Sequence, residues 1–147
     1  MDNQGDSFLE RELSYKLMGY FFDIRNQYGP YHQERVYDRV LQERLGLEHV
    51  KHTSQPKIEV YSLATGKKIA IYIPDLLVEN KIIVELKAKP FTTRDDEMQG
   101  QEYLKTSAYE IIYLVNFGEP NFRPRRFIFT NDRKPFIKLI QKNPSNP

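Results

Sequence analysis

Apolar residues recur at helical spacing in the first third of the chain. The first run has them three or four positions apart, at Leu9, Leu13, Leu17, Phe21, Ile24 and Tyr28. This period is typical of one buried helix face, and Ser7 with Glu10 forms a capping box that predicts where the helix begins. A second run over 32–45 predicts another helix, which Gly46 is expected to end.

From about residue 57 the apolar period becomes alternating, which is typical of strands. The expected elements are strands at 57–63, 68–78 and 81–88, a helix capped by Thr92 or Thr93 and ending near Ser107, strands at 110–116 and 126–130, and a helix at 132–141. Turns are expected at Thr65-Gly66 and at Glu79-Asn80. The first three strands should form a meander. The next helix implies a right-handed crossover into a mixed sheet, with helices on both faces.

Length and composition favour a single domain over residues 1–142, followed by a disordered tail at 143–147. No apolar run reaches the length of a membrane span, and the polar, acidic first residues do not resemble a secretory signal. The absence of cysteine excludes disulfides and thiolate metal sites. These features fit a reducing cytoplasm, so the expected location is cytoplasmic.

Basic residues are concentrated near the C-terminus, although the net charge is only +2. Residues 121–147 carry Arg123, Arg125, Arg126, Arg133, Lys134, Lys138 and Lys142. Such a stretch could meet the phosphates of a nucleic acid. A solvated, structural face is the alternative, and charge alone favours it.

Candidate chemistry lies in the strand 81–88, which is apolar except for a few charges. Glu85 and Lys87 are two positions apart, so they point to the same face of the strand. Charges in such a strand are costly without compensation. A divalent cation held by Asp75 and Glu85, with Lys87 beside it, would compensate them and would suit metal-assisted phosphodiester hydrolysis.

The placement of Asp75 depends on the length of the turn at Glu79-Asn80. A two-residue loop would put Asp75 on the face opposite Glu85, whereas a three-residue loop would bring the two carboxylates to one face. Asn80 tolerates the left-handed conformation that the longer loop needs. The alternative is that both acids form ordinary salt bridges with Lys81 or Lys87.

Three further residues could support such a site. Glu34 shares a helix face with the apolar stripe, so it could stand behind the metal ligands or pair with Arg35 or Arg39 at the rim. Gln99 and Tyr103 are four positions apart on one helix face, where they could position a phosphate or a water. They could equally form a surface pair. The three histidines show no metal-binding spacing.

Pro74-Asp75 followed by Glu85-Leu86-Lys87 resembles the motif of the PD-(D/E)XK nuclease superfamily. Over most of the chain the sequence resembles the GxxExxY protein family within it. The matching stretches are 12–16, 28–30, 34–37, 75–88, Gln99 with 103–105, and 114–118. Tyr31 stands where that family has the glycine of its name, and Asn80 where a turn glycine is common. Tyr31 is therefore expected to alter the start of the second helix.

The resemblance implies an α/β, restriction-endonuclease-like mixed β-sheet flanked by helices. It implies that Asp75 and Glu85 bind magnesium, or manganese, together with the backbone carbonyl of Leu86. Lys87 would be the catalytic lysine. We therefore expect a magnesium-dependent nuclease that acts on DNA more readily than on RNA. The alternative is a domain of the same fold that binds nucleic acid or protein without cutting; a homodimer or a partner protein is left open.

Overall fold

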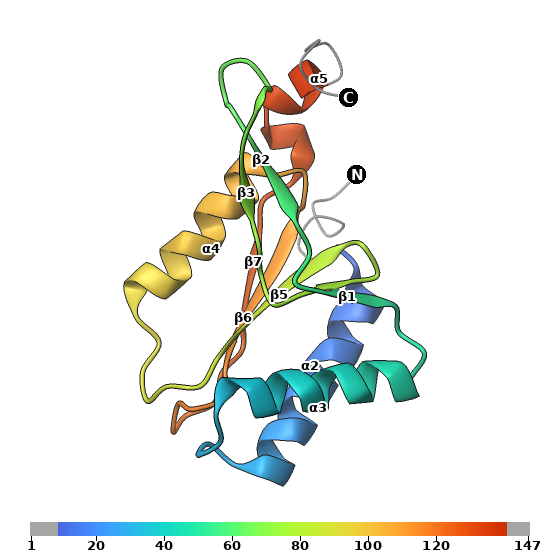
Figure 1. Ribbon diagram of the computed structural model, residues 1–147, viewed down its shortest axis with the longest axis vertical. Coiled ribbons are helices and arrows are strands. Elements are labelled where there is room, and N and C mark those ends of the chain that lie inside the picture. Colours follow the sequence, from blue (N-terminus) through green and yellow to red (C-terminus); the bar gives the residue numbers. More distant parts are fainter. Residues whose placement is uncertain (1–8, 141–147) are drawn as a thin grey trace.

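The computed structural model describes residues 9–140 (Figure 1). The helices are α2 (Arg11–Tyr28), α3 (Glu34–Leu47), α4 (Arg94–Thr106) and α5 (Phe136–Ile140), with a 3-10 turn at Asn131–Arg133. The strands are β1 (His52–Ser54), β2 (Ile58–Tyr61), β3 (Lys68–Tyr72), β4 (Leu76–Val78), β5 (Ile82–Lys87), β6 (Ile111–Asn116) and β7 (Arg125–Ile128).

The main sheet has five strands in the order β1-β4-β5-β6-β7. β5 and β6 are parallel and are joined through α4, whereas the other neighbouring pairs are antiparallel. α2 and α3 cover one face, and α4 lies on the other (Figure 1). The expected mixed sheet flanked by helices is confirmed, and β6 is an interior strand as its apolar sequence predicts.

Alternation along β5 explains both layers of the core. Val84 and Leu86 pack in a cluster with the apolar faces of α2 and α3. Ile83 points the other way and packs with Leu104 of α4 and Ile112 of β6. Because β5 is apolar on both faces, its polar side chains at the carboxyl end stand out as an exception that needs a reason.

The expected three-strand meander is wrong. The segment 68–78 divides into β3 and β4, and β2 with β3 forms a separate two-stranded sheet. Pro74 lies in the break, where its missing N–H and fixed φ disfavour a continuous strand. β4 instead pairs with β1 on its other side. β1 lies before the first expected strand, and its three polar residues carry no apolar alternation that would predict it.

Three helix boundaries differ from those expected. α2 begins at Arg11, after Glu10 in a left-handed conformation without a side-chain cap, and Ser7 lies outside the described residues. α3 begins at Glu34 and continues through Gly46. Tyr31 therefore lies in the preceding loop, and its expected effect on the start of the helix stays a prediction. The last helix is shortened to α5 because Pro135 separates it from the 3-10 turn.

The other turns agree better with expectation. Gly66 has a φ of 71° in the tip of the β2–β3 hairpin, and its N–H bonds to the carbonyl of Ser62. A Cβ atom at Gly66 would lie 2.7 Å from Cβ of Leu139, so the hairpin tip packs directly on α5. The expected tail at 143–147 lies outside the described residues. None of the helices within residues 9–140 is long and apolar enough to cross a membrane.

Candidate active site

Asp75 and Glu85 face one another across β4 and β5. Leu76 pairs with Val84 and Val78 pairs with Ile82, so the turn contains three residues and the next opposed positions are Asp75 and Glu85. Glu79 and Asn80 have φ values of 52° and 56°, which provide the left-handed conformation of the longer loop. The odd-length turn that the active-site hypothesis required is confirmed.

The two acids are fixed by reciprocal hydrogen bonds to backbone. The Asp75 N–H donates to Oε1 of Glu85 at 3.0 Å, and the Leu86 N–H donates to Oδ2 of Asp75 at 2.7 Å. Lys81 pairs with Glu10 instead of with either acid. The alternative of a salt bridge to Lys81 is therefore wrong, and the two carboxylates are held side by side at the break between the two sheets.

Burial disfavours ionisation of both acids, and the charge of Asp75 adds to this effect at Glu85. Burial, followed by the charge of Asp75, raises the pKa of Glu85 to about 7, against the opposing effects of the Asp75 N–H and Lys87. Burial also raises the pKa of Asp75, while the Leu86 N–H and Lys87 oppose the rise. Lys87 is therefore a nearby positive charge that favours the ionised form of both acids.

Helix α3 adds two more carboxylates to this region. Partial burial and the charge of Asp75 raise the pKa of Glu34, and Lys87 opposes that rise, so Glu34 interacts electrostatically with the site. Asp38 also raises the pKa values of Asp75 and Glu34. The sequence analysis missed Asp38, although its position four residues after Glu34 places it on the same helix face. Four carboxylates therefore interact with one another and with Lys87 in this region.

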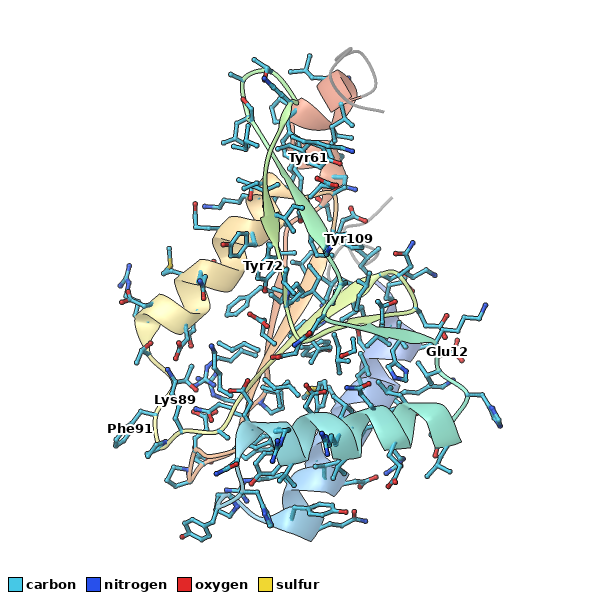
Figure 2. All side chains as sticks on the ribbon, in the orientation of Figure 1. Glu12, Tyr61, Tyr72, Lys89, Phe91 and Tyr109 are labelled. Atoms are coloured by element: carbon cyan, nitrogen blue, oxygen red, sulfur yellow. The ribbon has the colours of Figure 1, made fainter. Side chains whose placement is uncertain are left out.

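Helix α4 approaches the site from the other side. Gln99 lines a small cavity together with Glu85 and Lys87. Tyr103 is one step removed, because its ring stacks on Tyr72 with 3.7 Å between the centroids. The Tyr72 hydroxyl is buried next to Glu85. Burial and the charge of Glu85 raise the pKa of this hydroxyl, although no well-oriented hydrogen bond joins the two side chains. Figure 2 shows Tyr72 between the hairpin and α4.

A family model of the PD-(D/E)XK nuclease superfamily matches residues 11–127. The chain belongs to this superfamily. No curated protein and no solved structure matches the chain. Membership indicates nuclease activity on a nucleic-acid substrate, and members of the superfamily generally use divalent metal ions such as magnesium.

The donor set of this PD-(D/E)XK chain fits such an ion. Magnesium prefers oxygen ligands and often binds through one or two carboxylates while keeping several waters. Asp75 and Glu85 supply carboxylates whose repulsion a cation would relieve. Within residues 9–140, no group of three or more histidine, cysteine, aspartate or glutamate side chains could hold a metal ion. An ion here would therefore depend on the two acids, backbone oxygen and water.

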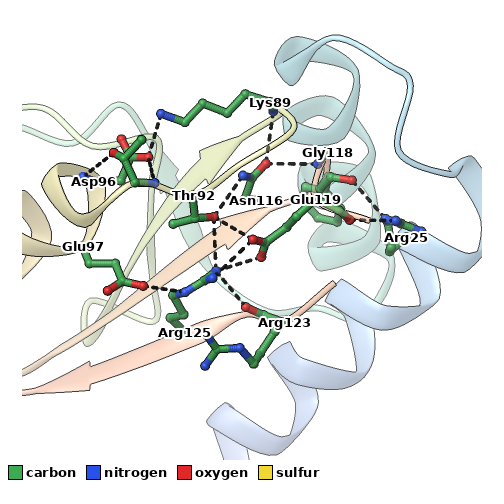
Figure 3. Close-up of polar contacts among 12 residues, drawn as sticks. Arg25, Lys89, Thr92, Asp96, Glu97, Asn116, Gly118, Glu119, Arg123 and Arg125 are labelled. Atoms are coloured by element: carbon green, nitrogen blue, oxygen red, sulfur yellow. Dashed lines mark hydrogen bonds and ion pairs between the residues drawn. The ribbon is translucent and has the colours of Figure 1, made fainter. Parts of the chain in front are cut away.

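A buried polar network lies beyond the carboxyl ends of β5 and β6 (Figure 3). Glu119 accepts hydrogen bonds from Arg125 at 2.7 Å and from the Thr92 hydroxyl at 2.9 Å. The Asn116 side chain donates to Thr92 and accepts from the Lys89 N–H. This network fixes the segment that follows Lys87. The sequence analysis did not identify it, because its members are scattered over distant positions.

The basic C-terminal stretch is largely structural within the described residues. Arg125 pairs with Glu97 and Glu119, and the Arg126 guanidinium donates to the Leu9 carbonyl. Lys134 is buried and donates to the carbonyls of Ser107 and Tyr109. These contacts favour the interpretation of this stretch as a structural face over that of a phosphate-binding one.

Proposed function

We propose that this PD-(D/E)XK domain is a magnesium-dependent nuclease that hydrolyses phosphodiester bonds in DNA, more readily than in RNA. The observation that carries the proposal is the pairing of Asp75 with Glu85 across a three-residue turn, with Lys87 on the same strand face as Glu85. Superfamily membership supports the reaction class. Membership of the GxxExxY family within the superfamily is part of the same proposal.

Asp75 and Glu85 would hold magnesium, or manganese, with the backbone carbonyl of Leu86. When bound, the ion would activate a water and offset negative charge on the phosphate. The Leu86 N–H supports this role because it holds one oxygen of Asp75 in place. The Asp75 N–H does the same for Glu85.

Lys87 would orient the attacking water and stabilise the charge that develops on the phosphate. Gln99 borders Glu85 and Lys87, so its amide would position the water or a phosphate oxygen. Glu34 would act as a positioning residue from α3. Tyr103 would act only indirectly: its ring stacks on Tyr72, whose hydroxyl lies next to Glu85.

The second candidate function is a non-catalytic domain that binds nucleic acid or protein. It is favoured by the observation that, within residues 9–140, no three or more histidine, cysteine, aspartate or glutamate side chains are grouped so that they could hold a metal ion. In either case, a second copy of the chain or a partner protein would contribute to choosing the substrate.

The decisive test replaces the lysine while keeping the carboxylates. Lys87→Ala should lower turnover of labelled DNA in magnesium at least about 100-fold, because its contact strengthens in the transition state. Lys105→Ala is the matched control, since Lys105 is an exposed lysine on α4 that, among the described residues, forms an ion pair only with Glu102. Circular dichroism and manganese titration should be nearly unchanged in both variants.

The measurement uses single- and double-stranded DNA and RNA with magnesium, manganese or EDTA. A well-folded Lys87→Ala protein that cuts as fast as the wild type would refute the proposed role of the lysine. If the wild type binds nucleic acid but cuts none with any metal, the non-catalytic function replaces the nuclease.

A further inference from the structure

Two exposed aromatic rings stand in the loops that border the candidate active site. Tyr31 lies between α2 and α3, three residues before Glu34, and is 96% exposed. Phe91 lies between β5 and α4, four residues after Lys87, and is 76% exposed. Figure 2 shows Phe91 on this connection, at the margin of the molecule, with Lys89 closer to the body.

Both loops are anchored to the same turn after β6. The Tyr37 hydroxyl bonds to the backbone of Gly29 and His32, and the Tyr37 ring stacks on Phe117 with 4.4 Å between the centroids. The next residue, Gly118, packs on the other loop, because a Cβ atom there would lie 2.6 Å from the backbone N and O of Lys89. The two loops are therefore held at one end of the sheet.

An electrostatic interaction also links the two loops. Burial and the charges of Asp75 and Asp38 raise the pKa of Glu34, and Lys89 opposes this rise together with Lys87. Tyr31 lies three residues before Glu34, and Phe91 lies two residues after Lys89. Each ring is therefore close in sequence to one member of a pair of charges that interact. The side chain of Lys89 forms an ion pair with Asp96 at 2.6 Å, which ties this loop to the start of α4.

The exposure of these rings is not explained by the fold. Within the part of the chain that the structure describes, neither ring stacks on another aromatic side chain or on a cation. Other aromatics of the same loops behave differently: Tyr28 contacts His32, and His32 contacts Tyr37. A single exposed apolar side chain is common on a protein surface, so what singles out Tyr31 and Phe91 is their place in two neighbouring loops beside the candidate active site.

Each ring has an exposed arginine close by in the sequence, beside the acidic side chains of Glu34 and of the first turn of α4. Arg35 follows Glu34 on the first turn of α3, and Arg94 begins α4; both are exposed. Alternating aromatic and basic side chains are how proteins hold single strands, because rings stack on bases while cations follow the phosphates. In a duplex the faces of the bases are covered by their neighbours, so such rings gain little there.

We propose that Tyr31 and Phe91 stack on unpaired bases on the two sides of the scissile phosphate, so that the preferred substrate is single-stranded DNA. This inference rests on the proposed nuclease function and specifies its substrate. It assigns the two residues to substrate specificity and leaves the chemistry to the acids and Lys87.

The test measures binding separately from cutting. A fluorescent single-stranded 15-nucleotide DNA and the same sequence as a blunt duplex are titrated with protein in EDTA, and anisotropy gives each Kd. Tyr31→Ala and Phe91→Ala should each weaken single-strand binding by about 5- to 150-fold, the range found for stacked bases. Duplex binding should change less than about twofold.

Three variants serve as controls. Tyr31→Phe should retain single-strand binding because it keeps the ring, whereas Phe91→Leu should lose it because it keeps only apolar surface. Tyr15→Ala should have no effect, since Tyr15 is also 79% exposed but lines a separate groove with Met18 and Pro124.

The outcomes separate this inference from the nuclease proposal. If the wild type cuts DNA but the alanine variants bind single strands as well as it does, stacking is wrong and the nuclease stands. Ring-dependent binding without cutting would keep the inference and remove the nuclease.

Equal losses on single strands and duplexes, or equal binding by Phe91→Leu and the wild type, would overturn stacking. A wild-type protein that binds no single-stranded DNA or RNA would also overturn stacking. Tighter binding to single-stranded RNA than to single-stranded DNA would overturn the proposal that DNA is the preferred substrate.

Discussion

At the scale of single residues, the carboxylates of Asp75 and Glu85 cannot relieve their repulsion by turning away. Each has one oxygen occupied by a backbone N–H of the facing strand. Those hydrogen bonds favour the charged form, but burial opposes it more strongly, and at Glu85 the charge of Asp75 adds to the opposition. The pair is therefore kept in a costly arrangement, which is typical of functional sites.

This arrangement predicts a pH-dependent cost in the absence of metal. Glu85 keeps its proton up to about pH 7 in the folded protein, against an ordinary value of 4.5. Between these values the folded state binds more protons than the unfolded chain, so the free energy of unfolding falls as pH rises. Glu85→Gln removes this loss and should be more stable than wild type at pH 8 by about 1 to 3 kcal/mol.

Thermal and urea unfolding in EDTA at pH 4 and pH 8 would measure this effect. The variant and the wild type should be close in stability at pH 4, where Glu85 is protonated in both states. Glu102→Gln is the control, since Glu102 is exposed on α4 and pairs only with Lys105 within the described residues. A Glu85→Gln protein that is less stable than wild type at pH 8 would contradict the prediction.

The sequence predicted part of this residue-scale arrangement. The period of two along a strand was enough to put Glu85 and Lys87 on one face. It was not enough to place Asp75, because the choice between a two- and a three-residue turn depends on backbone conformation. Glu79 as well as Asn80 adopts the left-handed conformation, and glutamate gives no such signal in a sequence.

At the scale of elements, α4 depends on its first turn. Thr93 and Asp96 form a capping box, in which the threonine hydroxyl accepts from the Asp96 N–H at 3.1 Å and the Asp96 carboxylate accepts from the Thr93 N–H at 2.9 Å. The pKa of Asp96 is lowered by these bonds and by Lys89, against some burial. The cap therefore sets the start of the helix that carries Gln99.

Removal of the cap should destabilise the protein modestly. Thr93→Ala leaves the Asp96 N–H without its acceptor, and the expected loss is about 1 kcal/mol. Urea denaturation would measure it, and Thr93→Ser should restore most of the loss. Thr106→Ala, at the other end of α4, is the control because its hydroxyl only bonds back to the Glu102 carbonyl. Equal stability of Thr93→Ala and this control would refute the capping role.

Element boundaries were predicted where local chemistry is strong. The cap at Thr92 or Thr93 and the turn at Gly66 are examples, since both depend on a few adjacent residues. β1 was not predicted, because its pairing with β4 is a tertiary contact and the pattern of its polar residues does not indicate a strand. The division of 68–78 had a visible signal in Pro74, which weakens any prediction of one long strand.

At the scale of the whole molecule, the network around Glu119 joins segments that are distant in the sequence. Arg25 of α2 donates to the carbonyls of Phe117 and Glu119, while the Glu119 side chain holds Thr92 and Arg125. The two ends of the Arg125–Glu119 ion pair are only 12% and 10% exposed. This one cluster therefore connects α2, β7 and the loop that follows Lys87.

Loss of its central acid should have a large effect. Glu119→Ala leaves the largely buried Arg125 with one of its two acidic partners, Glu97, and the expected destabilisation is about 3 kcal/mol, the range for breaking a buried pair. Glu102→Ala is the control: it breaks the exposed ion pair with Lys105 on α4 and should cost less than about 1 kcal/mol. Chemical denaturation compares the two, and similar losses would show that the network is not a stabilising element.

The three-residue turn between β4 and β5 also has a consequence for how the molecule folds. Asp75 and Glu85 are ten residues apart, so their meeting closes only a short loop of chain. Gln99 reaches them only after β5 and β6 pair through the α4 crossover, and Glu34 only after α3 docks. The two acids should therefore be brought together early, while the residues that would assist them arrive with the slow, long-range contacts.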